Sequence, residues 1–539
     1  MRVLGIEGTA WAASAAVYDT DADEVLIETE AYQPDSGGIH PREAAEHMRD
    51  AIPEVVAWAL AEARSRTDDG PPVDCVAFSR GPGLGPCLRI VGTAARALSG
   101  RLDVPLVGVN HMVAHLEIGR QRSGFDSPVC LNASGANAHL LGYRNGRYRV
   151  LGETTDTGVG NAIDKFTRHL GWSHPGGPKV ERRAREGAYH ELPYVVTGMD
   201  FSFSGIMSAA KEAVDEDVPV ADVCRGLEET IFAMLTEVSE RALALTGSDE
   251  LVLGGGVGQN DRLREMLETM CEARGADFFA PEPRFLRDNA GMIAVLGAKM
   301  YRAGDTIEIA DSRIDPDFRP DEVPVTWRDD ESVVRRGTES VLQGAEAEVS
   351  FEGDPPETVR KRRLPKAYRH PDLDTRLRRE RTRAEARLLR DARRAGVPTP
   401  LVRDVDLAET TLTLAFVGDD DLRNLLGDGE SSARATRAVR DVGRHLATLH
   451  EAGLVHGDPT TRNVRVGAER THLVDFGLGY HAEDVEAHAM DLHVFCGSLD
   501  GTADDADRLR TAVCEAYAER GDEQVVDHLA EVEGRGRYQ

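Results

Sequence analysis

Apolar and polar positions alternate in two different patterns along the chain. Up to about residue 325, short apolar runs end at a glycine or a polar turn and are followed by stretches with helical spacing. The clearest expected strands are RVLGIEG (2–8), VDCVAFSRG (73–81), PLVGVNH (105–111), PVCLNAS (128–134) and DELVLGGG (249–256). Strands that alternate with helices predict an α/β domain over residues 1–325.

A stretch rich in proline and acidic residues, RIDPDFRPDEVPVTWRDDES (313–332), interrupts this alternation. We expect a linker at 326–335 and a second domain at 336–539. The second domain has a different composition near its start, because residues 360–394 carry 15 basic and five acidic side chains.

The chain as a whole is strongly acidic, with 93 acidic and 64 basic residues and a net charge of −29. Such a surface repels nucleic acids and membranes on average, so contact with RNA requires a local basic patch. Residues 360–394 are the best candidate for that patch, and the alternative is a helix that packs against the acidic first domain. Few aromatic residues (5%) and only six lysines among the basic residues suggest adaptation to high salt.

Seven cysteines without any C-x-x-C spacing argue for a reducing compartment and against a zinc site built from cysteine. No stretch approaches the roughly 20 apolar residues that span a bilayer. We therefore expect a cytoplasmic protein with no membrane partner.

Three glycine-rich turns follow expected strands in the first domain: GIEGTA (5–10), SRGPGLGP (79–86) and NASGANAHL (132–140). Glycine lets backbone amides approach phosphate oxygens closely, so three such turns in one α/β domain suggest a nucleotide crevice. Each turn alone is more often just a tight turn, and none matches a dinucleotide fingerprint or a Walker loop.

His111 and His115 lie four residues apart in NHMVAHLEIG (110–119) and would share one face of a helix. Both imidazoles could then bind one metal ion, although two ligands alone do not make a site and a pair of structural histidines is the common alternative. A metalloprotease is disfavoured, because Met112 occupies the position of the glutamate that activates water in such enzymes.

The second domain contains LVHGDPTTRNVRV (454–466) followed by LVDFGLG (473–479). An aspartate with an asparagine five residues later and then D-F-G is the arrangement found in kinases. Asp458 would accept the proton of the substrate hydroxyl, and Asn463 and Asp475 would bind magnesium.

Upstream residues fit the same order. Lys361 would pair with the phosphates of ATP and with Glu385 on the next helix. QGAEAEVSF (343–351), with Gly344, replaces a full glycine-rich loop. A solvated charge run remains the alternative for Lys361, because it lies within RKRR (360–363).

Several ordered segments of the first domain resemble one known family: LGIEGTA, GGIHPREAAEHM, GPGLGPCLRIVGTAARAL, NHMVAHLE, DFSFSG, LGGGVGQN and RDNAGMIA. They are similar to the universal tRNA threonylcarbamoyladenosine biosynthesis proteins, the catalytic subunits of the KEOPS complex. The second domain resembles the small atypical kinase of the same complex. The resemblance implies a fold of the actin, sugar kinase and heat-shock ATPase class, with two related α/β lobes, followed by a small bilobal α+β kinase domain.

The resemblance also implies site residues. A metal, iron or zinc, would be held by His111, His115 and Asp288. Many relatives have a tyrosine ligand where this chain has Asn132, whose amide oxygen is a weaker donor. The residues expected at the nucleotide are Asn132, Ser134, Gly135, Asn137, Asp164, Gly177, Glu181 and Asn260. Without the resemblance, Asp164 and Glu181 would be read as solvated helix charges and Asn260 as a helix N-cap.

The implied reaction is transfer of threonylcarbamoyl from threonylcarbamoyl-AMP to N6 of the adenosine 3′ of the anticodon, in tRNAs that read codons starting with A. The fused kinase, with ATP and magnesium, would regulate or drive the cycle, and the other small KEOPS subunits would be partners. The alternative is a regulatory serine/threonine kinase whose first domain is a metal- and nucleotide-binding scaffold.

Overall fold

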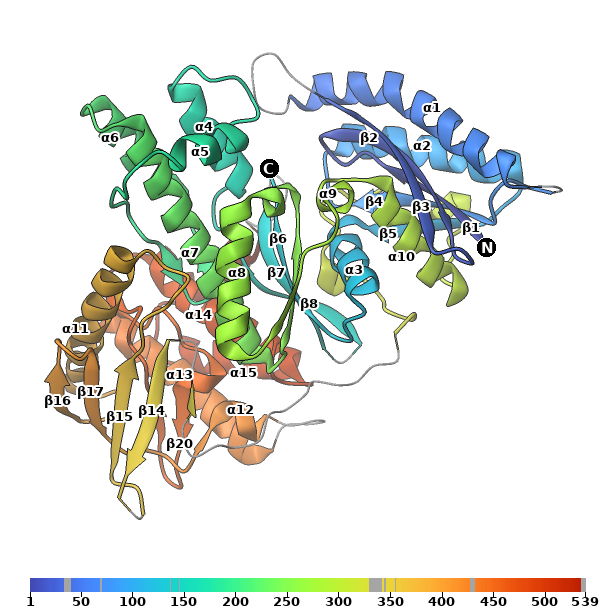
Figure 1. Ribbon diagram of the computed structural model, residues 1–539. Coiled ribbons are helices and arrows are strands. Elements are labelled where there is room, and N and C mark those ends of the chain that lie inside the picture. The colour runs from blue at the N-terminus through green and yellow to red at the C-terminus, as the bar shows by residue number, and fades with distance from the viewer. Residues whose placement is uncertain are drawn as a thin grey trace.

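The computed structural model describes residues 1–32, 40–67, 70–135, 137–144, 146–328, 342–343, 346–353, 355–426 and 432–534. The first domain has two lobes, each built on a five-stranded sheet (Figure 1). The strands of the first lobe are β1 (Arg2–Glu7), β2 (Ala12–Asp19), β3 (Glu24–Ala31), β4 (Cys75–Gly81) and β5 (Leu106–Asn110). The strands of the second lobe are β6 (Val129–Ala133), β7 (Ala138–Arg144), β8 (Arg147–Glu153), β11 (Glu250–Gly254) and β12 (Asp277–Phe279). All five strands expected from the apolar runs are therefore present.

The two sheets have the same topology. In the first lobe the order is β3-β2-β1-β4-β5, in which β1 pairs antiparallel with β2 and parallel with β4. In the second lobe the order β8-β7-β6-β11-β12 repeats this arrangement, with β6 antiparallel to β7 and parallel to β11. This repetition confirms the two related α/β lobes.

Helices cover both faces of each sheet. In the first lobe α1 (Pro41–Ser65) and α2 (Gly85–Leu102) cover one face, while α3 (His111–Ser123) and α10 (Ala290–Arg302) pack on the other, between the two sheets. Alternate residues of β1 divide between these two cores, since Leu4 and Ile6 face α1 and α2 whereas Val3 faces α10. The second lobe carries α4 (Val159–His169), α5 (Gly177–Ala184), α6 (Ser204–Asp215), α7 (Val220–Thr246), α8 (Asp261–Arg274) and α9 (Pro283–Leu286), and a short hairpin of β9 (Val196–Thr197) and β10 (Asp200–Phe201).

The second domain is a small bilobal kinase fold. Its first lobe is a sheet in the order β13-β14-β15-β17-β16, covered by helix α11. Its elements are β13 (Leu342–Gln343), β14 (Ala347–Glu352), β15 (Thr358–Arg363), α11 (Pro371–Ala395), β16 (Val402–Asp406) and β17 (Thr411–Ala415). The helical lobe has α12 (Leu422–Leu425), α13 (Ala433–Glu451), α14 (Val485–Asp500), α15 (Ala506–Ala518) and α16 (Glu523–Gly534) around a core of its own. Short strands β18 (Asp420–Asp421), β19 (Leu454–Val455), β20 (Val464–Val466), β21 (Thr471–Leu473) and β22 (Tyr480–His481) complete it.

One residue of the expected linker packs on the first domain. Arg328 is buried against Glu117 at 3.3 Å, and its guanidinium lies 3.7 Å from the ring centre of Tyr143. The rest of the expected linker, residues 329–335, lies outside the described part of the chain.

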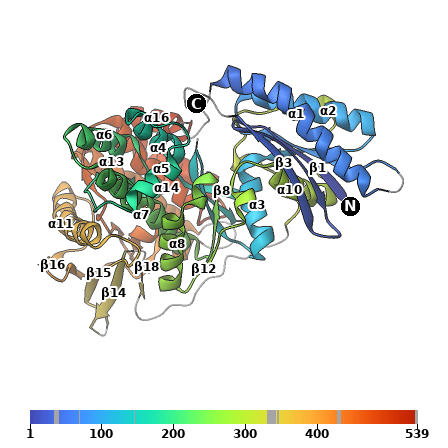
Figure 2. The same cartoon turned by 45° about the horizontal axis from the view of Figure 1, so that its top comes forward.

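The two domains lie side by side (Figure 2), and Glu237 of α7 pairs with Arg381 of α11 at 3.1 Å. Helix α14 of the kinase domain also packs against β8 of the first domain. Among the described helices, none combines the length and the apolar character needed to cross a bilayer.

Candidate metal centre and kinase cleft

The start of helix α3 places the two histidines. Asn110 ends β5 and caps the helix, since its side-chain oxygen accepts hydrogen bonds from the backbone N–H of Met112 and Val113 at 3.0 and 3.1 Å. His111 is therefore the first helical residue, and His115 lies one turn later on the same face.

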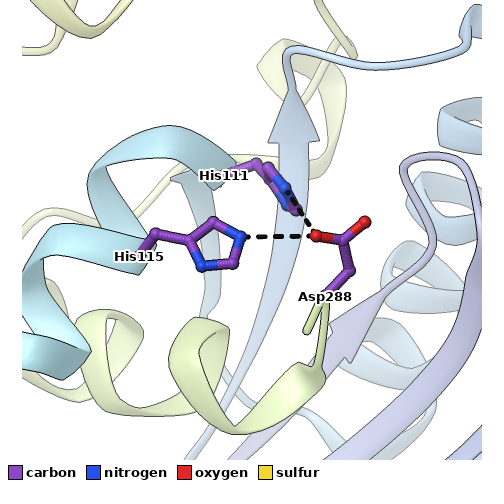
Figure 3. A group of neighbouring side chains, drawn as sticks. All are labelled: His111, His115 and Asp288. Carbon is purple, nitrogen blue, oxygen red and sulfur yellow. Dashed lines mark hydrogen bonds and ion pairs between the residues drawn. The ribbon is translucent and has the colours of Figure 1, made fainter. Parts of the chain in front are cut away.

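Asp288 meets both imidazoles from the segment before α10 (Figure 3). Its Oδ1 lies 3.4 Å from His111 Nε2 and 3.3 Å from His115 Nε2. The three ligand atoms lie within 4.8 Å of one another, as is needed to bind one ion. Asp288 is 173 residues from His115 along the chain, so only the closed fold brings this group together.

Glu7 at the end of β1 supports the first imidazole. Its Oε2 lies 3.1 Å from His111 Nδ1, and its Oε1 accepts from the N–H of Thr9 at 2.8 Å. A carboxylate behind a ligating histidine fixes the tautomer and leaves Nε2 for the ion. Sequence reasoning missed this role of Glu7, although a carboxylate inside an apolar strand is an unusual feature that could have signalled it.

The electrostatics also favour a cation. Burial opposes the charged form of His111, but the carboxylates of Glu7 and Asp288 outweigh it and raise the His111 pKa to about 10. Burial likewise opposes ionisation of Asp288, yet the two histidines hold its pKa well below the usual range. The same buried carboxylates that stabilise a protonated imidazole would also stabilise a divalent cation bound to the neutral imidazole in place of that proton.

Asn132 and His139 are two further buried polar residues near this group, and sequence reasoning missed His139. Asn132 on β6 pairs in register with His139 on β7, so both side chains lie on the same face of the sheet. Burial, followed by the charges of His115 and His111, lowers the pKa of His139 to about 3. The Asn132 amide oxygen is buried and has no hydrogen-bond partner among the described residues, and neither ring nitrogen of His139 has one. Buried polar atoms without protein partners, such as those of Asn132 and His139, are typical of a site that binds an ion.

The loop after β6 is a tight turn closed by its own hydrogen bonds. The N–H of Asn137 donates to Ser134 Oγ at 3.0 Å, and the N–H of Ser134 donates to the carbonyl of Asn137 at 2.9 Å. A Cβ atom on Gly160 would lie 2.7 Å from Gly135 Cα, so helix α4 approaches this loop closely. The predicted residues Ser134, Gly135 and Asn137 thus form one tight turn beside Asn132.

Asp164 is engaged within the protein. Its Oδ1 accepts from the N–H of Gly176 at 2.7 Å, and its Oδ2 lies 2.9 Å from His174 Nδ1. His174 in turn stacks on Trp11 of the other lobe, with ring centres 4.9 Å apart and planes 2° from parallel. Asp164 therefore positions a ring that bridges the two lobes.

The remaining predicted nucleotide residues lie in the second lobe. Gly177 begins α5, and Glu181 on the same helix pairs with Arg185 at 3.1 Å. Asn260 caps α8 and donates from Nδ2 to Glu228 at 2.8 Å. The helix-cap interpretation of Asn260 is thus confirmed, whereas its contact with a nucleotide stays a prediction.

The predicted kinase residues converge on one cleft. Lys361 Nζ lies 2.9 Å from Glu385 and 2.6 Å from Asp475, and Asn463 Nδ2 donates to Asp458 at 3.0 Å. Lys361 is therefore buried in the cleft and is not part of a solvated charge run. Asp475 adopts a left-handed backbone conformation with φ of 63°, a strain typical of functional sites.

Gly344, predicted in the shortened glycine-rich loop, lies outside the described residues. Apolar side chains line the cleft where the base of a nucleotide would lie; they include Ala347, Val349 and Leu414.

An arginine of the first domain enters this cleft. Arg241 on α7 donates from Nη1 to Asp458 at 2.8 Å and from Nη2 to Glu346 at 2.6 Å. Burial raises the pKa of Asp458 to about 7, and Arg241 only partly opposes this shift. An arginine of the first domain thus forms an ion pair with Asp458, the predicted proton acceptor of the second domain.

The basic run of α11 divides between two faces. Arg376 pairs with Glu191 at 2.7 Å and Arg381 pairs with Glu237 at 3.1 Å, both across the domain interface. On the exposed side of the helix, basic residues recur every four positions: Arg379, Arg383 and Arg387. The inner face of α11 therefore packs against the first domain, which is the alternative to an RNA-binding patch. The outer face of α11 carries an exposed row of basic residues.

Comparison with known proteins agrees with this arrangement. The family described as tRNA N6-adenosine threonylcarbamoyltransferase matches residues 22–295, and the lipopolysaccharide kinase (Kdo/WaaP) family matches residues 326–493. A Halobacterium salinarum protein is 72% identical over 100% of this chain and 99% of its own, and carries the name "Probable bifunctional tRNA threonylcarbamoyladenosine biosynthesis protein".

The chain belongs to this bifunctional family. Proteins of the same name from Haloarcula marismortui and Methanospirillum hungatei are 68% and 48% identical. The first alignment covers 100% of both chains, and the second covers 99% of both. The bifunctional family thus matches both domains in one chain, in the order that the sequence predicts.

Proposed function

We propose that the first domain transfers a threonylcarbamoyl group from threonylcarbamoyl-AMP to N6 of the adenosine 3′ of the anticodon in tRNA. The observation that carries this proposal is the group of His111, His115 and Asp288 at the junction of two lobes, in a chain of the bifunctional family. In the reaction, a bond forms between N6 and the carbonyl carbon, and the bond from that carbon to the phosphate oxygen of AMP breaks. The amine loses one proton, and AMP departs.

The residues of the site divide this work. His111, His115 and Asp288 would hold iron or zinc, which when bound acts as a Lewis acid toward an oxygen of the donor. Glu7 keeps His111 oriented. The backbone N–H of Gly135, in the turn after β6, would bind a phosphate oxygen of the donor, as amides in turns rich in small residues do elsewhere.

We further propose that the kinase domain binds ATP and magnesium. Lys361 would contact the phosphates, and Asn463 and Asp475 would bind magnesium, because these groups converge on one apolar-lined cleft. Arg241 holds Asp458, so phosphate transfer to a serine or threonine hydroxyl would require release of Arg241. This favours a controlled use of ATP within the modification cycle over constant protein phosphorylation.

The proposed RNA contact on this domain is the exposed row of α11. Arg379, Arg383 and Arg387 face outward in a chain of net charge −29, and clustered guanidinium groups are what phosphate contacts require. The other small KEOPS subunits are proposed as further partners.

Nucleoside analysis of tRNA by mass spectrometry tests the proposal. tRNA is incubated with the full chain, threonylcarbamoyl-AMP and the proposed partners, and threonylcarbamoyladenosine is quantified. We expect Asp458→Asn to retain transfer when the activated donor is supplied, and the double substitution His111→Ala with His115→Ala to lose it. Full transfer by the double variant would favour the alternative, a regulatory kinase with a scaffold domain.

A further inference from the structure

The proposed ligand His115 and two buried residues, Asn132 and His139, have polar atoms without hydrogen-bond partners in the described part of the chain. The atoms are His115 Nδ1, Asn132 Oδ1 and both ring nitrogens of His139. The exposed fractions of these residues are 1%, 3% and 0%. Buried polar groups are nearly always paired with protein, water or an ion, so several unpaired groups in one place indicate a ligand or ordered water.

Two of the three side chains approach the same glycine. A Cβ atom on Gly254 would lie 3.3 Å from Asn132 Oδ1, 3.7 Å from Cys130 Sγ and 3.7 Å from His115 Cβ. His139 lies directly opposite Asn132 in the β6–β7 ladder, and the side chains of such a pair are close neighbours. Asn132 therefore connects His139 with the surroundings of His115.

The two ligating histidines differ in what lies behind them. His111 has a carboxylate of Glu7 at 3.1 Å from Nδ1, whereas His115 Nδ1 has no partner among the described residues. Figure 3 shows His115 Nε2 directed at Asp288 while its other ring nitrogen points away from that carboxylate. A ligating histidine requires an acceptor at the second nitrogen to fix its tautomer.

We propose that Asn132 and His139 are positioning residues of the metal centre. Together they hold a bridging water, whose oxygen accepts a hydrogen bond from the N–H at His115 Nδ1. Asn132 Oδ1 accepts one hydrogen of that water, and a ring nitrogen of His139 takes up the remaining hydrogen bond. Such a water has three polar partners, as buried waters usually do. The result is that His115 Nε2 keeps its lone pair for the ion. This inference rests on the proposed metal at His111, His115 and Asp288.

Metal binding by the purified full chain tests the role of His139 without an activity assay. Zn²⁺ affinity is measured by competition with a chromophoric chelator, and the visible absorption of the Co²⁺ form reports ligand geometry. Loss of an outer partner of a ligating histidine typically weakens metal binding about 10- to 100-fold. We expect His139→Leu to fall in that range and to change the Co²⁺ spectrum, while His139→Gln, which keeps a donor and an acceptor, retains part of the affinity.

The controls separate this role from a general effect of removing a buried imidazole. His445, in the kinase domain, donates from Nε2 to the carbonyl of Thr471 at 3.0 Å, and His445→Leu should leave Zn²⁺ affinity unchanged. Unchanged affinity and spectrum in folded His139→Leu would overturn the inference. If that variant does not fold, the same measurements on His139→Gln and Asn132→Leu decide, and wild-type affinity in both overturns it.

The same titrations distinguish this inference from the proposed function. If the wild-type chain binds Zn²⁺ and His115→Ala abolishes binding, the metal proposal stands whatever His139 does. If His115→Ala binds Zn²⁺ as tightly as wild type, the proposed metal site fails first, and the role of His139 fails with it.

Discussion

Arg241 Nη1 lies 2.8 Å from Asp458 Oδ2, although the two residues are 217 positions apart and belong to different domains. Glu237 and Glu346 complete the network around the same guanidinium at 3.1 and 2.6 Å. A buried arginine with three carboxylates is a fixed element of the interface, because removing any one partner leaves uncompensated charge. The kinase cleft is therefore partly built by the first domain.

Removal of this arginine should release the kinase cleft. We expect Arg241→Ala to raise ATP hydrolysis several-fold at pH 9, because Asp458 is freed and the domain interface loosens. An alkaline pH is needed because Arg241 lowers the pKa of Asp458, so its loss raises that pKa further. Arg376→Ala, which breaks the pair with Glu191 in the same interface, should leave ATP hydrolysis near wild type. Steady-state ATP turnover and limited proteolysis would be measured together, and lower turnover in folded Arg241→Ala would contradict an inhibitory contact.

ATP turnover should depend on pH through Asp458. Its pKa is raised to about 7 by burial, so the carboxyl group is mostly protonated at pH 6 and mostly ionised at pH 8. Because only the carboxylate accepts a proton from the attacking hydroxyl, we expect turnover to rise about tenfold over this interval. Asp458→Asn should remove the activity, and a flat profile in the wild type would show that this carboxylate is not the acceptor.

Loss of the metal ligands should separate the two activities. We expect His111→Ala to lower bound metal, measured by elemental analysis, and to reduce threonylcarbamoyl transfer at least 100-fold. ATP hydrolysis should persist, because the kinase cleft contains none of these ligands. Parallel loss of both activities in a folded variant would point to a metal shared by the two domains.

The exposed row of α11 should contribute to tRNA affinity. We expect Arg383→Glu with Arg387→Glu to weaken tRNA binding at least tenfold and to reduce the dependence of log Kd on log salt by about 1.4–1.8, since each lost phosphate contact removes roughly 0.7–0.9. Arg42→Glu with Arg49→Glu on α1 carries the same charge change and serves as the control. Equal effects from both pairs would indicate net charge alone and exclude a defined surface.

Much of the fold follows from local pattern. The five apolar runs form β1, β4, β5, β6 and β11, because alternating strands and helices must bury one face or both. The D-F-G segment, Asp458 and Asn463 are close in sequence, so their spacing alone places them in one cleft. The contact of Arg328 with the buried carboxylate of Glu117 is one that no local pattern reveals.

The sequence by itself determined the residues whose chemistry depends on short spacing: two imidazoles one helical turn apart, and the kinase motif. The role of Asp288 as the third metal ligand was predicted from the family resemblance, since nothing in local spacing connects it with His115. Only the tertiary structure decided that Glu7 supports His111, that His139 lies opposite Asn132, and that Arg241 enters the kinase cleft. The physical reason is that these contacts join segments far apart in the chain, whose approach depends on how sheets pair and domains pack.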